Sequence, residues 1–425
     1  MKVVHIVPGS GGTFYCQNCM RDGALVQALR RAGEDVVMVP MYLPMFTDGD
    51  PAQDNTPVFF GGINVWLQQQ VPFFRKTPRW LDRWFDSQWM LKRAAKMEGT
   101  TSAAGLGAMT LSMLEGTEGN QRKEVERLVQ WLAEHENPDA VHISNALLVG
   151  MAGEIKARLD VPVVCSLQDE DGWLDEINPP FGEACWDAIR TRVGDVDRFV
   201  AVSHWYADRM SERLRIPRDR IDVVHVGIDL VGFGQAALDF DPPVLGYLSR
   251  MNEKLGMGKL VDAFIELKKF PGLEKLKLRA TGGLVGDDRK YVSNLRKKLA
   301  RRGMENDAEF IADFSREHRL AFLESLSVMC VPVEQGEAFG TYIIEAMAAG
   351  VPVVQPNAGA FPELVEATGG GVIYEDLTAT LRELLTHPDR ARELGRKGRE
   401  SVLERFGVEA MAQNTLAIYE TILSH

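Results

Sequence analysis

Two carboxylates in the second half of the 425-residue chain, Glu337 and Glu345, lie eight residues apart. Glu337 follows an apolar run at residues 328–333 that predicts a buried parallel strand. Glu345 interrupts an apolar helix predicted for residues 341–349, where a carboxylate needs strong donors in place of water. Ligands of open α/β sheets bind at the carboxyl ends of strands, and a helix that begins there offers unpaired N–H groups to an anion. The pattern predicts a ligand with hydroxyls and phosphates, such as a nucleotide sugar.

A purely structural explanation of the two glutamates is also open, in which Glu345 pairs with an arginine and Glu337 is a solvated loop residue. The surrounding sequence favours the ligand. Glu-Ala-Phe-Gly at residues 337–340, Glu-Ala-Met-Ala-Ala-Gly-Val-Pro-Val-Val at residues 345–354 and Gly-Ala-Phe-Pro-Glu at residues 359–363 resemble the donor-site signature of the family 4 glycosyltransferases. Those enzymes are retaining and have the GT-B fold of two Rossmann-like domains.

The resemblance implies a role for each residue of the donor turn. Glu345 would bind the ribose hydroxyls, and Glu337 would bind the donor sugar. The backbone of three further residues would complete the cradle for the diphosphate: Phe339, Gly340 and Thr341.

A second strand-loop-helix, which begins at Gly-Tyr-Leu-Ser-Arg (residues 246–250), resembles the segment that reaches the diphosphate in the family. Arg250 would donate to phosphate oxygens in a fixed geometry. The family usually has a lysine five or six residues later, where this chain has Leu255 and Gly256. We expect Lys254 to take that role, with Lys259 as the alternative.

Two glycine-rich turns follow predicted strands. Gly-Ser-Gly-Gly at residues 9–12 lets the backbone approach a ligand closely, so Gly12 is a candidate near the donor phosphates. It lacks the usual dinucleotide spacing, and a tight turn without a ligand is the alternative. Gly282, in Thr-Gly-Gly at residues 281–283, is expected in the wall of the nucleotide pocket.

The acceptor side departs from the family pattern. Members commonly carry a histidine after the strand that corresponds to residues 163–167, whereas this chain has Gln168. Glutamine is no general base near neutral pH, although it can hydrogen-bond a sugar hydroxyl. Asp169 and Asp171 are candidates for acceptor hydroxyls, or they form a solvated acidic turn. His142 is expected to be a packed, hydrogen-bonded residue, and Ser203 a helix cap.

Cys16 and Cys19 lie just after the first glycine-rich turn, with two residues between them. Thiols near a helix start can be redox-active. No further cysteine or histidine pair lies at zinc-finger spacing, so structural zinc is disfavoured. Structural packing, or packing at the acceptor site, is the interpretation that we expect.

Residues 73–96 carry seven basic and two acidic residues in a chain with a net charge of −12. Tryptophan and phenylalanine are interleaved with the basic residues, as in helices that lie in a membrane interface. The same composition suits an acceptor pocket or an amphipathic helix packed on its own domain. Peripheral contact with the inner face of a membrane is therefore one of three open interpretations.

The composition sets the class of protein. The chain is long enough for two or three domains, and its acidic balance argues against a nucleic-acid partner. Five scattered cysteines do not suggest a disulfide framework, and a cytoplasmic protein is expected. No signal peptide is recognised, and no apolar run approaches the ~20 residues of a membrane span.

Alternating strand-like and helix-like runs predict an α/β protein with parallel sheets. A proline-bearing linker at residues 239–243 divides an N-terminal acceptor domain, residues 1–240, from a donor domain, residues 241–407. Residues 73–119 read as a helical insertion. The final helix, residues 408–425, resembles the closing helix that returns to the N-terminal domain in the family.

The resemblance thus implies transfer of a sugar from a nucleoside-diphosphate sugar to a hydroxyl acceptor with retention. No cofactor and no metal ion are expected, because Arg250 and a lysine would neutralise the leaving diphosphate. Two rival functions are a nucleotide-sugar sensor that has lost catalysis, suggested by Gln168, and a dinucleotide-dependent oxidoreductase. The latter is disfavoured because no Gly-x-Gly-x-x-Gly opens either half.

Overall fold

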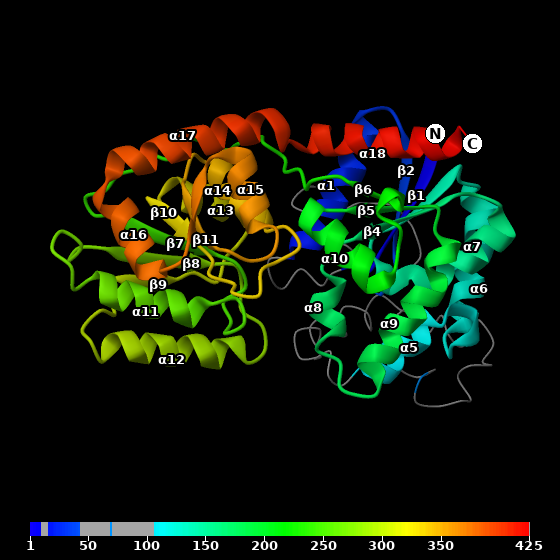
Figure 1. The fold of residues 1–425 in the computed structure, drawn as a ribbon, viewed down its shortest axis with the longest axis horizontal. Helices are drawn as coiled ribbons and strands as arrows, with labels where there is room; N and C mark the ends of the chain where they lie inside the picture. Colours follow the sequence, from blue (N-terminus) through cyan, green and yellow to red (C-terminus); the bar gives the residue numbers. More distant parts are fainter. Residues whose placement is uncertain (10–15, 43–68, 70–105, 425) are drawn as a thin grey trace. The chain divides into compact units, whose positions relative to one another are not determined.

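The computed structural model describes residues 1–9, 16–42, 69 and 106–424. Contacts divide these residues into two units, shown in Figure 1. Among the described residues, the first unit holds residues 1–9, those from Asn18 to His225, and the C-terminal residues from Met411 onward. The second unit holds Val226–Ala410 together with Cys16 and Gln17. Val226 lies fifteen residues before Asp241, so this division falls ahead of the linker at residues 239–243.

The first unit contains a six-stranded parallel sheet in the order β2-β1-β3-β4-β5-β6. Short apolar runs form these strands, as expected for a sheet with helices on both faces. The strands are β1 (Lys2–Val7), β2 (Asp35–Pro40), β3 (Ala140–Ile143), β4 (Val163–Leu167), β5 (Arg198–Ala201) and β6 (Ile221–Val223). The helices of this unit include most of α1 (Gln17–Arg31), α5 (Gly107–Leu114), α6 (Arg122–Trp131), α7 (Ala152–Leu159), α8 (Glu170–Leu174), α9 (Phe181–Arg192), α10 (His204–Leu214) and most of α18 (Val408–Leu423).

The second unit has a parallel sheet in the order β12-β11-β10-β7-β8-β9. The strands are β7 (Val244–Leu248), β8 (Lys277–Thr281), β9 (Ala308–Phe310), β10 (Val328–Cys330), β11 (Val353–Pro356) and β12 (Gly371–Tyr374). The order reverses between β7 and β10, and such a reversal opens a crevice at the carboxyl ends of the two strands. The helices are α11 (Met257–Leu267), α12 (Asp288–Ala300), α13 (Arg316–Glu324), α14 (Thr341–Ala348), α15 (Phe361–Thr368), α16 (Leu377–Thr386) and α17 (Pro388–Arg405).

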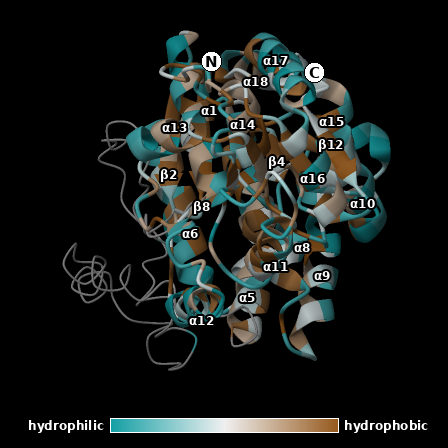
Figure 2. Cartoon of the chain, turned by 90° about the vertical axis from the view of Figure 1, so that its left-hand side faces the viewer, coloured by the Kyte–Doolittle hydropathy of each residue, from teal (hydrophilic) through white to brown (hydrophobic). Residues whose placement is uncertain are grey.

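Helix α14 lies in the core of the second unit, and every one of its residues is buried. In Figure 1, α11 and α12 lie on one side of the sheet, and α14, α15 and α17 lie on the other. Figure 2 shows apolar residues gathered along the strands and hydrophilic residues along α17. The charged Glu345 therefore lies on a helix that has no face toward solvent.

The α/β class and the two parallel sheets confirm the fold predicted from the sequence. The apolar runs of the sequence predict strands at residues 3–7, 36–39, 140–143, 161–165, 199–202, 221–224, 244–247, 276–280, 309–311, 328–333 and 351–354. The ends of the observed strands agree with these to within about two residues, except that β10 ends at Cys330, three residues before the predicted end. Strand β12 was not among the predicted strands. Of the predicted insertion, the described part contains α5 and a 3-10 turn at Gly116–Glu118, whereas residues 73–96 lie outside the described residues.

Among the described residues, no helix combines the length and the apolar character needed to cross a bilayer.

Candidate functional site

The candidate site forms where β7 and β10 end, on either side of the reversal in strand order. Ser249 and Arg250 follow β7, and the turn that contains Glu337 follows β10. Burial raises the pKa of Tyr247, in β7, well above its usual range, and the nearby Glu337 carboxylate adds to the rise. The two strand ends thus bring Glu337 close to the segment that carries Arg250.

The turn after β10 packs on the turn after β11 through two glycines. Gly336 and Gly359 have φ angles of 73° and 60°, which L side chains rarely adopt. A Cβ on Gly336 would lie 2.2 Å from the backbone nitrogen of Gly359, so no side chain fits there. The Ala360 N–H donates to the carbonyl of Glu337 at 3.0 Å. The backbone around Glu337 is therefore fixed by the neighbouring turn.

Helix α14 begins directly after this turn. Gly340 is its N-cap residue, with a φ of 97°. The backbone N–H of Thr341 donates to the side-chain oxygen of Gln17 at 2.6 Å, and Nε2 of Gln17 lies 3.5 Å from Oε2 of Glu337. The first N–H of the helix and the carboxylate before it therefore face the same amide. Phe339 is buried and packs near Phe406.

Glu337 is half-buried, and burial raises the pKa of its carboxyl group. Interactions with the Tyr342 hydroxyl and the Gln17 amide oppose this rise. In turn, burial and the Glu337 charge hold the pKa of Tyr342 well above its usual range. Glu337 thus combines limited hydration with polar neighbours, which distinguishes it from the ordinary solvated loop residue of the structural alternative.

Glu345 has the arginine partner that the structural alternative required. Nη2 of Arg319, on α13, donates to Oε1 of Glu345 at 3.3 Å, and both side chains are only 4% exposed. This contact shows how the carboxylate is accommodated on an apolar helix. Arg319 also donates to the carbonyl of Phe314 at 2.9 Å.

Arg250 forms a two-point contact with Asp288, at the start of α12. Its Nε donates to Oδ2 at 2.7 Å and its Nη2 to Oδ1 at 3.3 Å. The carboxylate fixes the plane of the guanidinium, and the arginine side chain is 34% exposed. Lys254 is exposed in the loop before α11, whereas the alternative candidate, Lys259, pairs with Glu334.

Gly282 lies where the backbones after β7 and β8 approach each other. Its φ is 131°, and a Cβ there would lie 2.1 Å from the carbonyl oxygen of Ser249. The preceding Thr281 donates from its hydroxyl to the carbonyl of Asp313 at 2.8 Å. Glycine is thus required for backbone packing beside Arg250, whatever its contact with a ligand.

Gln168 lies in a buried polar network of the first unit and is 2% exposed. Its side-chain oxygen accepts from Arg21 at 3.3 Å, and its Nε2 donates to the carbonyl of Ser144 at 2.7 Å. Arg21 also contacts Asp22 and Ser166, at 3.1 and 3.2 Å. The amide expected to meet an acceptor hydroxyl is therefore engaged with the protein interior.

Asp169 and Asp171 flank Glu170, a residue that sequence reasoning did not single out. Glu170 is 1% exposed and accepts from the backbone of Ala146 and Gln168, at 2.9 and 2.8 Å. Burial raises the pKa of this carboxyl group despite these contacts. Asp169 is exposed, and Asp171 pairs with Arg209 at 2.5 Å. In this acidic turn, Glu170 is therefore structural, Asp169 is at the surface, and Asp171 is in an ion pair.

The expectations for His142 and Ser203 are confirmed. His142 is fully buried, and its ring nitrogens lie 2.5 Å from the Tyr419 hydroxyl and 2.8 Å from the Ser166 hydroxyl. Burial lowers the pKa of His142 well below its usual range, which disfavours the charged form of the ring. Ser203 is the N-cap of α10, and its hydroxyl accepts from the Tyr206 N–H at 3.1 Å.

The cysteines fall into two groups. Cys165, Cys185 and Cys330 are buried free thiols, and Cys16 and Cys19 are disulfide-bonded.

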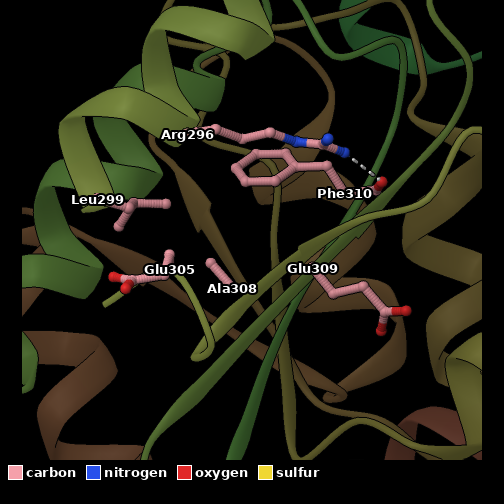
Figure 3. A pocket seen from close by; sticks show the side chains of 6 residues that line it. All are labelled: Arg296, Leu299, Glu305, Ala308, Glu309 and Phe310. Atoms are coloured by element: carbon pink, nitrogen blue, oxygen red, sulfur yellow. Dashed lines mark hydrogen bonds between the residues drawn. The ribbon is translucent and has the colours of Figure 1, made fainter. Parts of the chain in front are cut away.

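A pocket of about 300 Å³ lies between β9 and the second half of α12, as Figure 3 shows. Arg296 lies over Phe310 and donates to its carbonyl at 3.0 Å. None of the residues predicted to bind a donor lines this pocket. Gly12 and residues 73–96 lie outside the described residues.

The chain is similar to known glycosyltransferases. Residues 233–401 match the family model described as "Glycosyl transferases group 1", and residues 114–231 match "Glycosyltransferase Family 4". An MMP alpha-(1->4)-mannosyltransferase of Mycolicibacterium hassiacum is 34% identical over 134 residues, which are 30% of this chain and 32% of that relative. The match thus spans about a third of the relative's length.

Two solved structures share the fold over the whole chain. Sucrose-phosphate synthase from Thermosynechococcus elongatus has a TM-score of 0.72 and 18% identity, covering 100% of this chain and 99% of that one. Anabaena HepE, solved in complex with UDP, has a TM-score of 0.67 and 15% identity, covering 99% and 100%.

Proposed function

Because the chain belongs to the family 4 glycosyltransferases and has their GT-B fold, we propose that it transfers a sugar from a nucleoside-diphosphate sugar to a hydroxyl acceptor, with retention of the anomeric configuration. The observation that carries the proposal is the start of α14 at the reversal in strand order. There, backbone N–H groups suited to a phosphate lie beside the carboxylate of Glu337.

Two kinds of group would hold the donor at this point. Carboxylates would bind its hydroxyls, and backbone N–H groups would bind its phosphates. Glu337, fixed by the turns around Gly336 and Gly359, would accept from hydroxyls of the donor sugar. Glu345 would bind the ribose hydroxyls while Arg319 compensates its buried charge. The backbone of Phe339, Gly340 and Thr341 would hold the diphosphate.

The leaving diphosphate gains negative charge as the sugar departs. Arg250, oriented by Asp288, and Lys254 would stabilise that charge in place of a metal ion. Gly282 would form part of the nucleotide wall beside Arg250, and Gly12 would face the phosphates from the N-terminal half. We expect neither a metal ion nor another cofactor for the reaction.

Uridine diphosphate is the first nucleotide to test, because a neighbour in fold was solved with it. The acceptor is a glycan, a glycolipid or a small hydroxyl compound. The basic, tryptophan-rich residues 73–96 favour a lipid-linked or membrane-proximal acceptor, with the protein at the inner face of the membrane. Asp169 and Asp171 are the candidates for acceptor hydroxyls, whereas Gln168 would act through Arg21 and Ser144.

A sensor that binds nucleotide sugars without transfer is a second candidate, favoured by Gln168 in the place of the usual histidine and by its engagement in the interior. One experiment separates the two. Thermal shifts with UDP, GDP and ADP conjugates identify the donor, because a ligand of the native state raises the apparent stability. Product formation from that donor is then followed with and without acceptors. Transfer or donor hydrolysis supports the enzyme, binding alone supports the sensor, and no binding contradicts both.

A further inference from the structure

Tyr247 is a buried residue to which the proposed function gives no role. It lies in β7, three residues before Arg250, and its side chain is 0% exposed. Burial and the nearby Glu337 charge raise the pKa of its hydroxyl well above the usual range, so the group keeps its proton and can donate it. The role inferred for Tyr247 rests on the proposed function in one respect: Arg250 and Lys254 must bind the diphosphate.

The Tyr247 hydroxyl contacts both ends of the loop that carries these two cations. It donates to the carbonyl of Arg250 at 3.0 Å and to the carbonyl of Leu255 at 3.1 Å. A hydroxyl has one proton, so the two carbonyls must converge on the same point. Lys254 immediately precedes Leu255. One contact of Tyr247 is therefore made with the residue that bears the first cation, and the other is made directly beside the second cation.

The loop is also held by contacts of its own. The side-chain oxygen of Asn252 accepts from the N–H of Leu255 at 2.9 Å. The N–H of Gly256 donates to the carbonyl of Glu253 at 3.1 Å. These contacts close the loop into a compact turn, and the Tyr247 hydroxyl attaches that turn to the end of β7.

The far end of the loop packs on the segment that leads to the donor turn. Gly256 has a φ of 78°, and a Cβ on it would lie 2.2 Å from the carbonyl oxygen of Pro332. Pro332 lies between β10 and the turn that contains Glu337. At the near end of the loop, Asp288 holds the Arg250 guanidinium. The loop is therefore placed by β7, by the segment after β10 and by the start of α12, all within the second unit.

We propose that Tyr247 is a positioning residue for the transfer reaction, whose hydroxyl fixes the loop backbone so that Arg250 and Lys254 act together on the diphosphate. Asp288 fixes the plane of the Arg250 guanidinium, whereas Tyr247 fixes the backbone from which that side chain extends. The same contact gives Lys254 its place. Leu255 stands where the family usually has a lysine, and its carbonyl, held by Tyr247, orients the residue before it.

Tyr247→Phe removes the hydroxyl and keeps the ring, so it tests this contact alone. The Kd of uridine diphosphate should rise about 3- to 10-fold, the usual worth of one hydrogen bond. The Kd of uridine monophosphate should rise less, because this ligand lacks one of the two phosphates that the cations share. General damage to the site would weaken the binding of both nucleotides alike. If the parent prefers guanosine or adenosine diphosphate, that nucleotide and its monophosphate replace the uridine pair.

A double-mutant cycle with Arg250→Ala separates positioning from an independent structural role. In the Arg250→Ala background, Tyr247→Phe should lose most of its effect, because one of the cations that Tyr247 positions is absent. The effects of independent residues would add instead. Asn252→Ala loosens the same loop from within and should weaken diphosphate binding in the same way, so the test does not depend on the folding of one variant.

Tyr374→Phe is a matched control. It also deletes a buried tyrosine hydroxyl of the second unit, and among the described residues that hydroxyl has no hydrogen-bond partner. This variant should bind both nucleotides as the parent does.

A further measurement needs no nucleotide. Hydrogen exchange of a peptide that contains residues 252–256 should be faster in Tyr247→Phe than in the parent or in Tyr374→Phe. If exchange is faster but no nucleoside diphosphate binds to the parent, the donor site is wrong and the loop contact stands. Unchanged exchange in Tyr247→Phe would overturn the proposal. So would equal weakening of the diphosphate and the monophosphate, or a full effect of Tyr247→Phe in the Arg250→Ala background.

Discussion

Glu345 and Arg319 form an ion pair in the interior of the second unit, with 3.3 Å between Oε1 and Nη2 and only 4% of each side chain exposed. The pair gives Glu345 a structural role in addition to its proposed contact with ribose. A buried charge that loses its partner is costly, because neither water nor another group replaces the contact. Any loss of nucleotide binding in a Glu345 variant must therefore be read together with its stability.

We expect Glu345→Ala to lower the free energy of unfolding by about 3 kcal/mol, because Arg319 is left charged and buried. Denaturant unfolding measures this loss. Glu345→Gln keeps a hydrogen-bond acceptor and should lose less. If Glu345→Ala is as stable as the parent, the buried pair has been misassigned. If the variant reaches the stability of the parent only when excess donor is present, nucleotide binding and folding are coupled.

Arg250→Ala should slow transfer by about 100-fold or more, the usual worth of one electrostatic donor to a developing charge. Asp288→Asn should slow transfer less, because the Arg250 guanidinium stays in place and loses only one of its two contacts with residue 288. Single-turnover rates with the identified donor provide the measurement. Lys275→Ala is a matched control, because the pair of Lys275 with Asp241 lies on the surface, with side chains 75% and 82% exposed. Equal rates in Arg250→Ala and the control would contradict the assignment.

Glu337 should determine the acid side of the pH profile. Burial raises its pKa above the usual value of 4.5, so the carboxylate is lost at a higher pH than for an exposed glutamate. As pH falls through the raised pKa, kcat/KM should decline because the protonated group binds hydroxyls less well. For stability the sign is opposite: the contribution of this group is present below the unfolded-state pKa and is lost as pH rises through the folded-state pKa.

Glu337→Gln tests both signs in one variant. In the variant, the decline of kcat/KM at acid pH should disappear, and the plateau value of kcat/KM should be lower than in the parent. The loss of stability that the parent shows as pH rises should be smaller in the variant. An unchanged acid limb in this variant would assign the limb to another group.

Removal of divalent metal ions should leave transfer within about two-fold of the untreated rate, because Arg250 and Lys254 take the place of a metal at the leaving diphosphate. The rate is compared before and after dialysis against a chelator. A loss of activity that added Mg²⁺ or Mn²⁺ restores would show that the two cations are insufficient.

Residues 73–96 should bind anionic membranes if the acceptor is membrane-proximal. Their charge is +5, from seven basic and two acidic residues, and Trp80 and Trp84 share a helical face if the segment is helical. Vesicle flotation at low and physiological salt measures the binding, and replacement of Arg79 and Arg83 by glutamine should weaken it. Protein that stays unbound at both salt concentrations, with unchanged tryptophan fluorescence, would leave this segment as ordinary packing.

The sequence predicts the sheets well because buried parallel strands are continuous apolar runs, as in β1, β3 and β7. Strand β12 escaped prediction because it begins with glycine and is only half-buried over Gly371–Ile373. The start of α14 was predictable from Gly340 and the apolar run that follows it.

The partners of the predicted residues were not predictable. Arg319 precedes Glu345 by 26 positions on another helix, and nothing in its own neighbourhood marks it as buried. Gln17 is 324 positions from Thr341, and an isolated glutamine carries no motif. Asp288 near Arg250 likewise depends on how α12 is placed after β8. Local patterns indicate which residues carry charge, but tertiary packing decides what compensates it.

The two turns that meet at Gly336 and Gly359 also limit how the site can be re-engineered. Because backbone lies against backbone there, a change in donor preference cannot come from filling the space between the two turns. In a saturation library, only glycine should survive selection at these two positions. The exposed Gln335 and Asn357 beside them should tolerate many residues, and variation in selected libraries should therefore concentrate on the rim of the turns.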